Sequence, residues 1–257
     1  MRQEKRDRQA KILDALGRAP SLRVAELALP LQVSTETIRR DLDELTEAGL
    51  LNRTYGGAVR PQGSEPAIAE RKLINLQERR RIAQAATRLV GDARSLLLGS
   101  GATVEHVARE IAARLDNIMV TTHSCGVAAA LASNSSIEVM LIPGLYHAAE
   151  ACVFGGHAIV FLQNLYADYV ILGASGVDQD GPNNALAETA AVNAAMLGRS
   201  AKSIVVADQG KFNQQFATRY ASWTQIGTLV TDAPPPETLA SSLNSHNVRL
   251  LVAEETG

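Results

Sequence analysis

Residues 33–57 read VSTETIRRDLDELTEAGLLNRTYGG, and this stretch predicts the fold of the amino-terminal part of the chain. Ser34 is suited to the N-cap of a helix, because its hydroxyl can accept a hydrogen bond from a backbone N–H of the first turn. The apolar positions that follow at helical spacing are Ile38, Leu42 and Leu45. They predict a helix with one face in a small core. Gly49 predicts the end of this helix.

The opposite face of the predicted helix is polar and carries two adjacent arginines, Arg39 and Arg40. Short polar side chains at its start leave the positive end of the helix dipole free to approach a phosphate, and an arginine fork can bind guanine. The basic, aromatic and Gly-Gly residues that follow predict a tight hairpin, a wing beside the helix. Each feature alone also fits a solvated amphipathic helix, but their order favours DNA binding. The expected DNA contacts are Ser34, Thr35, Thr37, Arg39, Arg40, Arg53, Tyr55, Gly56 and Gly57.

Two further helices are predicted before this segment, at residues 5–16 and 24–31. Their apolar positions are Ile12, Leu13 and Leu16 in the first and Val24, Leu27, Ala28 and Leu31 in the second. Pro30 is expected to shorten or kink the second helix, since proline lacks an N–H and its ring clashes with the preceding turn. Three helices and a hairpin in this order predict a winged helix-turn-helix.

Length and charge predict two domains with different roles. The 257 residues exceed the usual size of one domain, and 46% hydrophobic with 4% aromatic residues predicts aliphatic cores. Through Arg81 there are 16 Lys and Arg against 12 Asp and Glu, a net charge of +4; the remainder holds 9 against 15, a net charge of −6. Phosphate contact needs local positive charge, so DNA binding is expected only in the first part. Because the margin is modest, two recognition helices on one homo-oligomer are expected to bind together.

Several function classes are not supported by the sequence. Cys125 and Cys152 form no CxxC motif or disulfide framework, as expected of reduced residues in a cytoplasmic protein. No apolar run is long enough to cross a bilayer, and the charged start is not followed by the apolar stretch of a signal peptide. The histidines show no metal-ligand spacing. We expect no membrane association, no metal, no cofactor and no catalytic residues.

A segment rich in Pro and Gly separates the two parts, with breaks at Pro61, Gly63 and Pro66. The sequence predicts a DNA-binding domain at residues 1–60, a linker at 61–78 and an effector-binding and oligomerisation domain at 79–257. A helix is expected at roughly 67–90. The arginine run 79–81 can contact the DNA backbone, but a solvated face or an interdomain contact is favoured.

From about residue 95, short apolar runs alternate with helical stretches. The predicted strands are 95–98, 118–122, 137–142, 168–173, 203–207, 226–231 and 248–252. The predicted helices between them include 103–115, 124–133, 186–199 and 236–244. This alternation predicts an α/β domain with a mostly parallel sheet covered by helices. Ligands of such sheets bind beyond the carboxyl ends of the strands, so the loops after each strand are the candidate site.

The loop at residues 99–103 combines small residues, two hydroxyls and a helix start, which suits a phosphate. The same residues also fit an ordinary strand-to-helix turn. Lys211 is the clearest candidate cation, because this domain has few basic residues, although it also fits a surface lysine. The expected effector contacts are Ser100, Gly101, Ala102, Thr103, Thr122, His123, Gly144, Gly173, Gly176, Asp178 and Lys211.

The amino-terminal pattern resembles that of the DeoR family of bacterial transcriptional regulators. It reads Val33-Ser34-x-x-Thr37-Ile38-Arg39-Arg40-Asp41-Leu42, then Gly49-Leu50, then Arg53-x-Tyr55-Gly56-Gly57-Ala58. The similarity runs almost end to end. It implies a sugar-phosphate sensor domain with a fold similar to ribose-5-phosphate isomerase and CoA-transferase-like proteins. It also implies a sequence-specific repressor of a carbohydrate or polyol catabolic operon. Such a homodimer or homotetramer leaves its double-stranded DNA operator when a phosphorylated sugar or polyol binds.

The chain departs from the family pattern in its loops. Where the family usually has Asp-Ser-Gly-Thr-Thr, this sequence has Gly99-Ser100-Gly101-Ala102-Thr103. The usual Thr-Asn is Thr122-His123, the usual Gly-Gly is Pro143-Gly144, and a Lys-Arg pair of a later helix is Asn193-Ala194. The Asp-x-x-Lys-Phe loop is kept at residues 208–212.

Two alternative functions stay open at this point. A sugar-phosphate isomerase-like enzyme needs a carboxylate base beside a lysine or oxyanion partner. Asp178, Glu188, Asp208 and Lys211 are available, but no motif places them together. In the other alternative the second domain only oligomerises. A sensor differs from both, since its ligand raises its stability without turnover.

Overall fold

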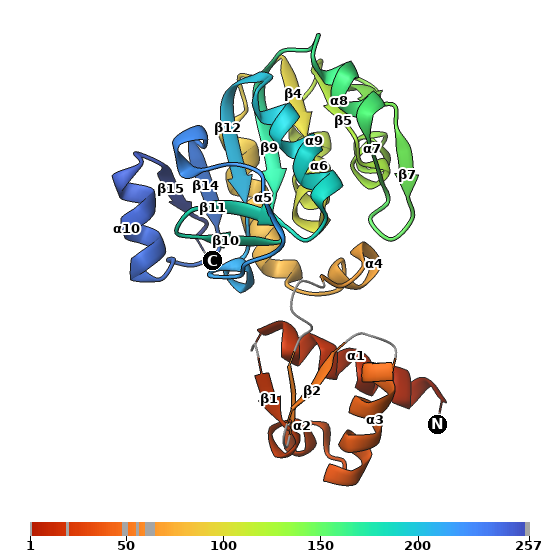
Figure 1. Ribbon diagram of the computed structural model, residues 1–257. Coiled ribbons are helices and arrows are strands. Elements are labelled where there is room, and N and C mark those ends of the chain that lie inside the picture. Colours follow the sequence, from red (N-terminus) through yellow and green to blue (C-terminus); the bar gives the residue numbers. More distant parts are fainter. Residues whose placement is uncertain (1, 19–20, 48–50, 55–56, 60–64, 255–257) are drawn as a thin grey trace. The chain divides into compact units, whose positions relative to one another are not determined.

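The computed structural model describes residues 2–18, 21–47, 51–54, 57–59 and 65–254. The chain forms two compact units, Met1–Pro66 and Ala67–Gly257 (Figure 1). The predicted helix end at Gly49 and the predicted DNA contacts Tyr55 and Gly56 lie outside the described residues.

The first unit consists of three helices and a small antiparallel sheet. Its elements are α1 (Arg2–Arg18), β1 (Ser21–Arg23), α2 (Val24–Leu31), α3 (Thr35–Glu47), β2 (Asn52–Thr54) and β3 (Gly57–Val59). Strand β3 lies between β1 and β2 and pairs antiparallel with both. The predicted winged helix-turn-helix is confirmed, and β1 is an addition to it. Pro30 lies inside α2 one residue before its end, and Gln32 closes the helix with φ 53°.

A buried apolar cluster and a largely buried ion pair hold the three helices together. The cluster comprises Ile12, Val24, Leu27, Ala28, Ile38, Leu42, Leu45 and Leu51. Beside it, Asp41 on α3 is 1% exposed. The Arg8 guanidinium on α1 donates to both of its oxygens, Nε to Oδ2 at 2.5 Å and a terminal nitrogen to Oδ1 at 3.1 Å. This bidentate pair fixes α3 against α1.

The second unit is built on a parallel sheet of seven strands, and all seven correspond to predicted ones. They are β4 (Ser95–Leu98), β5 (Met119–Thr122), β6 (Glu138–Leu141), β9 (Ala167–Gly173), β12 (Ser200–Val206), β14 (Thr228–Thr231) and β15 (Arg249–Val252). Their order is β15-β14-β12-β9-β4-β5-β6, and each neighbouring pair is parallel. The chain moves outward from β4 to β6 and then returns to the other side of β4 with β9. In parallel sheets this reversal opens a crevice at the carboxyl ends of the two central strands.

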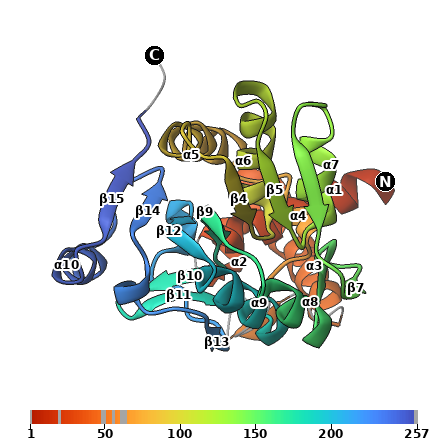
Figure 2. The same ribbon diagram turned by 90° about the horizontal axis from the view of Figure 1, so that it is seen from above.

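Helices cover both faces of this sheet. They are α5 (Leu76–Leu89), α6 (Ala102–Arg114), α7 (Cys125–Leu131), α8 (Gly156–Leu162), α9 (Ala187–Leu197) and α10 (Glu237–Ser245). Figure 2 shows α5, α6 and α7 on one side and α8, α9 and α10 on the other. The side chains of β4 alternate accordingly: Leu96 and Leu98 join the first helix group, and Leu97 joins the second. Burial on both faces explains the continuous apolar runs of the sequence.

The segment between the two domains differs from the prediction. In place of one helix at 67–90 there are two, α4 (Ile68–Arg71) and α5, separated by a turn in which Asn75 has the left-handed φ of 52°. Residues 67–78, expected to belong to a linker, are part of the second unit. The reason is a set of polar contacts with that unit, described below.

Short strands at the carboxyl edge of the sheet were not predicted. They are β7 (Leu145–His147) with β8 (Cys152–Phe154), and β10 (Gly176–Asp178) with β11 (Gly181–Asn184) and β13 (Thr218–Arg219). The first pair follows β6, β10 and β11 follow β9, and β13 follows β12. Figure 1 shows β10, β11 and α4 at the same end of the second unit.

Candidate DNA-binding and effector sites

The amino-terminal end of α3 is capped and faces solvent. The backbone N–H of Thr37 donates to the Ser34 hydroxyl at 3.1 Å, so Ser34 is the N-cap, as predicted. Ser34 and Thr35 are exposed, and the side chains of Arg39 and Arg40 are 57% and 78% exposed. The polar face expected to bind DNA is therefore available to a ligand.

Both arginines lie near one carboxylate in the unbound chain. Glu36 is 3.6 Å from the Arg39 guanidinium and 3.8 Å from that of Arg40. Exposed pairs of this kind contribute about 1 kcal/mol or less. A DNA phosphate can therefore replace Glu36 at little cost.

The predicted wing is the β2–β3 hairpin, in which Thr54 pairs with Gly57. Gly57 is buried against β1, because a Cβ atom there would lie 2.2 Å from the Leu22 carbonyl oxygen. This close approach accounts for glycine at position 57. Arg53 belongs to β2.

The phosphate-type loop after β4 opens helix α6 at the crevice between β4 and β9. Gly101 precedes the helix with φ +115°, a conformation that favours glycine. Ala102 and Thr103 are the first residues of the helix, whose first-turn N–H groups have no helical partners. A Cβ atom on Gly173, at the end of β9, would lie 3.2 Å from the Ser100 carbonyl oxygen. Gly173 thus lets β9 approach this loop closely.

Strand β8 brings three of the predicted loops together. The Ser100 side chain lies close enough to the Cys152 thiol to lower its pKa, and the Val153 N–H donates to the His123 carbonyl at 2.8 Å. A Cβ atom on Gly144 would lie 2.7 Å from the Phe154 carbonyl oxygen. Burial, with a contribution from the Glu150 carboxylate, raises the pKa of Cys152 to about 12. The Cys152 thiol is therefore protonated at neutral pH. Its place beside these loops was not predicted from the sequence.

His123 is completely buried. Its Nδ1 lies 2.9 Å from the Val153 carbonyl oxygen. Its Nε2 has no hydrogen-bond partner among the residues the structure describes. The neighbouring Thr122 is also buried, and its hydroxyl accepts from the Ser124 N–H at 3.0 Å. Of these two predicted contacts, only His123 has an unsatisfied polar atom in the side chain.

The loops after β9 and β12 also meet. The Asn213 N–H donates to the Val177 carbonyl at 2.8 Å, which places β10 beside the short helix η1 (Gln209–Lys211). Asp178 is buried and accepts from the N–H groups of Asp180 at 2.8 Å and Gly181 at 3.1 Å. The Asp178 carboxylate therefore stabilises the turn between β10 and β11.

Gly176 has a packing role in the same region. A Cβ atom there would lie 2.0 Å from the Gln214 carbonyl oxygen. Lys211 ends η1 directly beside this contact. Of the three predicted residues in these two loops, Lys211 remains the candidate for ligand contact.

Residues 67–79, here called the strap, form the start of the second unit and contact the carboxyl edge of its sheet. At one end, the Ile68 N–H donates to the Ala149 carbonyl at 3.0 Å, and Arg71 forms an ion pair with Glu150. Both acceptors lie in the β7–β8 turn. The same turn reaches the loop after β5, because the Cys125 N–H donates to the Ala151 carbonyl at 2.9 Å.

The other end of the strap contacts the loop after β12. The Asn75 amide donates to Asp208 Oδ1 at 3.1 Å, and Arg79 Nε lies 3.6 Å from Asp208 Oδ2. Arg79 also donates to the Arg71 carbonyl. Between the two ends, Lys72 Nζ lies 2.8 Å from the buried Glu105 of α6. The strap therefore contacts elements on both sides of the candidate crevice.

The buried position of Arg79 corrects one expectation. Its side chain is 2% exposed and paired within the second unit, so it lies neither on a solvated face nor on DNA. Arg80, the next residue, is exposed on α5.

Two departures from the DeoR pattern are neighbours in space. A Cβ atom on Gly99 would lie 3.4 Å from Asn193 Oδ1 on α9. An acid at position 99 and a lysine at position 193 would thus be in reach of each other. In this chain position 99 is glycine and position 193 is asparagine, so the negative and the positive charge of the family pattern are both absent and the local net charge is unchanged.

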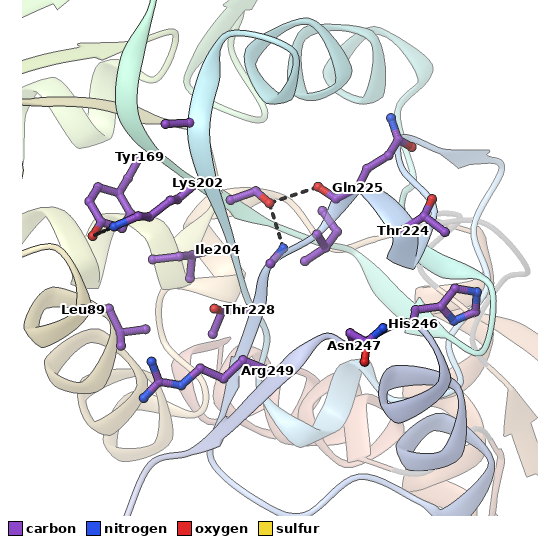
Figure 3. A pocket seen from close by; sticks show the side chains of 14 residues that line it. Leu89, Tyr169, Lys202, Ile204, Thr224, Gln225, Thr228, His246, Asn247 and Arg249 are labelled. Carbon is purple, nitrogen blue, oxygen red and sulfur yellow. Dashed lines mark hydrogen bonds between the residues drawn. The ribbon is translucent and has the colours of Figure 1, made fainter.

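A separate hollow of about 620 Å³ lies at the opposite edge of the sheet, at the amino ends of β12, β14 and β15 (Figure 3). Lys202, His246 and Arg249 line it. Lys202 donates to the Tyr169 hydroxyl at 2.8 Å. None of the predicted effector residues lines this hollow.

The described part of the chain contains neither a cluster of metal-binding side chains nor a membrane-spanning helix. No group of three or more His, Cys, Asp and Glu side chains in it is arranged to hold a metal ion. No helix in it is both long and apolar enough to cross a membrane.

Each of the two units matches a known protein domain. Residues 8–63 match the DeoR-like helix-turn-helix domain, and residues 74–233 match the DeoR C-terminal sensor domain. The HTH-type transcriptional repressor CsqR of Escherichia coli is 30% identical over 96% of this chain and 95% of its own length. The glycerol-3-phosphate regulon repressor of Escherichia coli is 30% identical over 88% of this chain and 90% of its own.

Among solved structures, ribose 5-phosphate isomerase A of Methanocaldococcus jannaschii aligns with a TM-score of 0.41. The identity is 16%, over 55% of this chain and 56% of that one. A likeness of this size says nothing about activity. The two domain matches and the full-length relatives are decisive: the chain belongs to the DeoR family of transcriptional regulators.

Proposed function

We propose that this chain is a cytoplasmic repressor of a carbohydrate or polyol catabolic operon. A phosphorylated sugar or polyol releases it from its operator. The observation that carries the proposal is the pairing, on one chain, of an exposed, capped recognition helix with an anion-type loop at a sheet crevice. Repression follows the two relatives named above, which are both repressors.

The DNA-binding role is assigned to Ser34, Thr35, Thr37, Arg39, Arg40 and the wing. A homodimer or homotetramer would place two α3 helices on paired half-sites, which raises affinity by making the second contact intramolecular. The phosphate of the effector is assigned to the loop at residues 100–103, where first-turn N–H groups and two hydroxyls are available. Lys211 is assigned as a further cation.

The strap supports a route between the two sites. It directly follows the first unit, and it contacts the β7–β8 turn at one end and Asp208 at the other. An effector that pulls these loops together changes the contacts of the strap. The size of the coupling is limited by the difference in effector affinity between the DNA-bound and free arrangements.

The test combines operator binding with ligand binding. We expect salt-sensitive binding to the promoter region of the chain's own operon, and release by at least one member of a panel of sugar and polyol phosphates. The same compound should raise the melting temperature without being converted. Conversion would favour the isomerase alternative, and the lack of any ligand response would favour the oligomerisation alternative. Failure of the chain to bind its promoter would contradict the proposal.

A further inference from the structure

In the buried side chain of His123, one ring nitrogen forms a hydrogen bond and the other has no hydrogen-bond partner among the described residues. His123 directly follows β5, the neighbour of β4 in the sheet, so it lies beside the loop assigned to the phosphate. A carbonyl oxygen can only accept a hydrogen bond. The contact with Val153 therefore places the proton of the ring on Nδ1.

The remaining nitrogen, Nε2, is then a hydrogen-bond acceptor. Burial lowers the pKa of His123 to about 4, and the hydrogen bond to Val153 offsets only part of this effect. The ring is thus neutral at pH 7, and Nε2 carries a lone pair without a proton. Nε2 has neither solvent contact nor a partner within the described part of the chain. A buried acceptor without a donor is unfavourable, and such a group calls for an explanation.

The chemistry of the missing partner follows from this protonation state. Ionised phosphate and carboxylate oxygens carry lone pairs and cannot donate to another lone pair. A hydroxyl group can donate. We propose that the loops after β4 and β5 part to admit the effector, and that Nε2 of His123 then accepts a hydrogen bond from an effector hydroxyl and so selects hydroxylated phosphates over phosphates with a carboxylate at that position. This inference rests on the proposed function, because it names the ligand chemistry of the same site.

The two adjacent loops then have separate tasks. The N–H groups at the start of α6 offer donors, which suit the phosphate. His123 offers an acceptor, which suits a hydroxyl. Val153 of β8 holds His123 through two hydrogen bonds, and the neighbouring Cys152 lies beside Ser100, so both loops adjoin the same strand. The spacing between phosphate and hydroxyl is therefore set by a rigid element.

The experiment compares matched probes on matched variants. The probes are glycerol 3-phosphate against 3-phosphoglycerate, glucose 6-phosphate against 6-phosphogluconate, and inorganic phosphate. Affinities are measured by calorimetry on the full-length chain. The test variant His123→Leu removes the acceptor, and His123→Asn keeps a short polar side chain. His157→Leu, at an exposed position on α8, is the control.

We expect the unmodified chain to prefer the hydroxylated member of the pair that binds. His123→Leu should weaken that member about tenfold, the size of one lost hydrogen bond, and leave inorganic phosphate unchanged. Unchanged melting and operator binding show that the variant is folded. If His123→Leu does not fold, the comparison is made with His123→Asn. In nitrogen NMR of the unmodified chain, the Nε2 resonance of His123 should be that of an unprotonated nitrogen and should shift when the probe binds.

The outcomes separate this inference from the proposed function. If no member of the panel of sugar and polyol phosphates binds the unmodified chain, both are wrong. If a probe binds equally well to His123→Leu and the unmodified chain, only the role of His123 is wrong. A proton on Nε2, or an Nε2 resonance already hydrogen-bonded to water and unaffected by the probe, also overturns it.

Discussion

Arg71 on α4 and Glu150 in the β7–β8 turn form an ion pair between groups 79 positions apart in the chain, with side chains only 9% and 15% exposed. Arg71 lies five residues into the second unit. Glu150 adjoins Ala151, whose carbonyl holds the loop after β5. One contact thus joins the segment that follows the DNA-binding unit to the turn beside the proposed effector loops.

The first prediction concerns this pair. Arg71→Gln and Glu150→Gln should each reduce the ratio of operator Kd values measured with and without the releasing sugar phosphate. The reason is that the strap loses its charged attachment to the β7–β8 turn, which contacts the proposed effector loops. Operator binding without effector should persist. Fluorescence anisotropy with labelled operator measures both quantities.

The control for this prediction is Arg114→Gln, which removes an ion pair with Glu110 within α6, where Arg114 is 54% exposed. It should leave the ratio unchanged. An unaltered ratio in both Arg71→Gln and Glu150→Gln would show that the effector signal takes another route.

The second prediction concerns the recognition helix. Arg39→Ala and Arg40→Ala should each weaken operator binding about 10- to 100-fold, as expected for arginine contacts to a base or phosphate. A lost phosphate contact should also lower the slope of log K against log salt by about 1. Neither side chain belongs to the core of the first unit, so stability should not change.

Arg80→Ala supplies the comparison, because Arg80 is exposed on α5. Its operator affinity should match that of the unmodified chain. A loss as large as that of Arg39→Ala would instead place Arg80 on the DNA backbone.

The sequence predicts the large sheet well because its central strands are apolar. The run Leu96, Leu97 and Leu98 is buried on both faces, which gives a continuous signal that needs no partner to be recognised. The recognition helix is predictable for a similar reason, since its cap and its apolar stripe are local.

The edge of the sheet is less predictable because its structure depends on distant partners. Strand β11 reads GPNN, which has no strand periodicity, and it forms by pairing with β10 and β13. From sequence alone the strap is predicted to be a charged helix, because its charges do not reveal which residues they contact. Its actual contacts, Asp208 and Glu150, are distant in the sequence. The loops of the effector site follow from topology, whereas the unsatisfied Nε2 of His123 depends on Val153 of the unpredicted β8.

The third prediction concerns the Arg8–Asp41 pair. Asp41→Asn should destabilise the first unit by about 3 kcal/mol or somewhat less, because Asp41 is buried and Arg8, at 21% exposure, keeps some access to water. Denaturant unfolding of the full chain, followed by helical circular dichroism, measures the change. Glu44→Gln is the control, since its pair with Lys5 is exposed at both ends and should contribute little to stability. Equal losses in the two variants would contradict the structural role given to Asp41.

The fourth prediction concerns pH and His123. The pKa of this residue falls from 6.5 to about 4 on folding, because burial disfavours the charged ring. Below pH 6.5 the unfolded chain therefore binds a proton that the folded chain does not bind. The free energy of unfolding must then fall as the pH falls from 6.5 toward 4. His123 alone should account for a loss of about 2 kcal/mol between pH 7 and pH 5.

The measurement is urea unfolding at the two pH values for the unmodified chain and for His123→Leu. The variant should lose about 2 kcal/mol less than the unmodified chain over this interval, because leucine takes up no proton. His106 contributes in the same direction, since burial and the nearby Arg109 and Arg79 lower its pKa to about 4. It is present in both proteins, so its contribution cancels in the comparison. Parallel losses would mean that His123 is not held neutral in the folded chain. The acceptor assigned to its Nε2 would then be untenable.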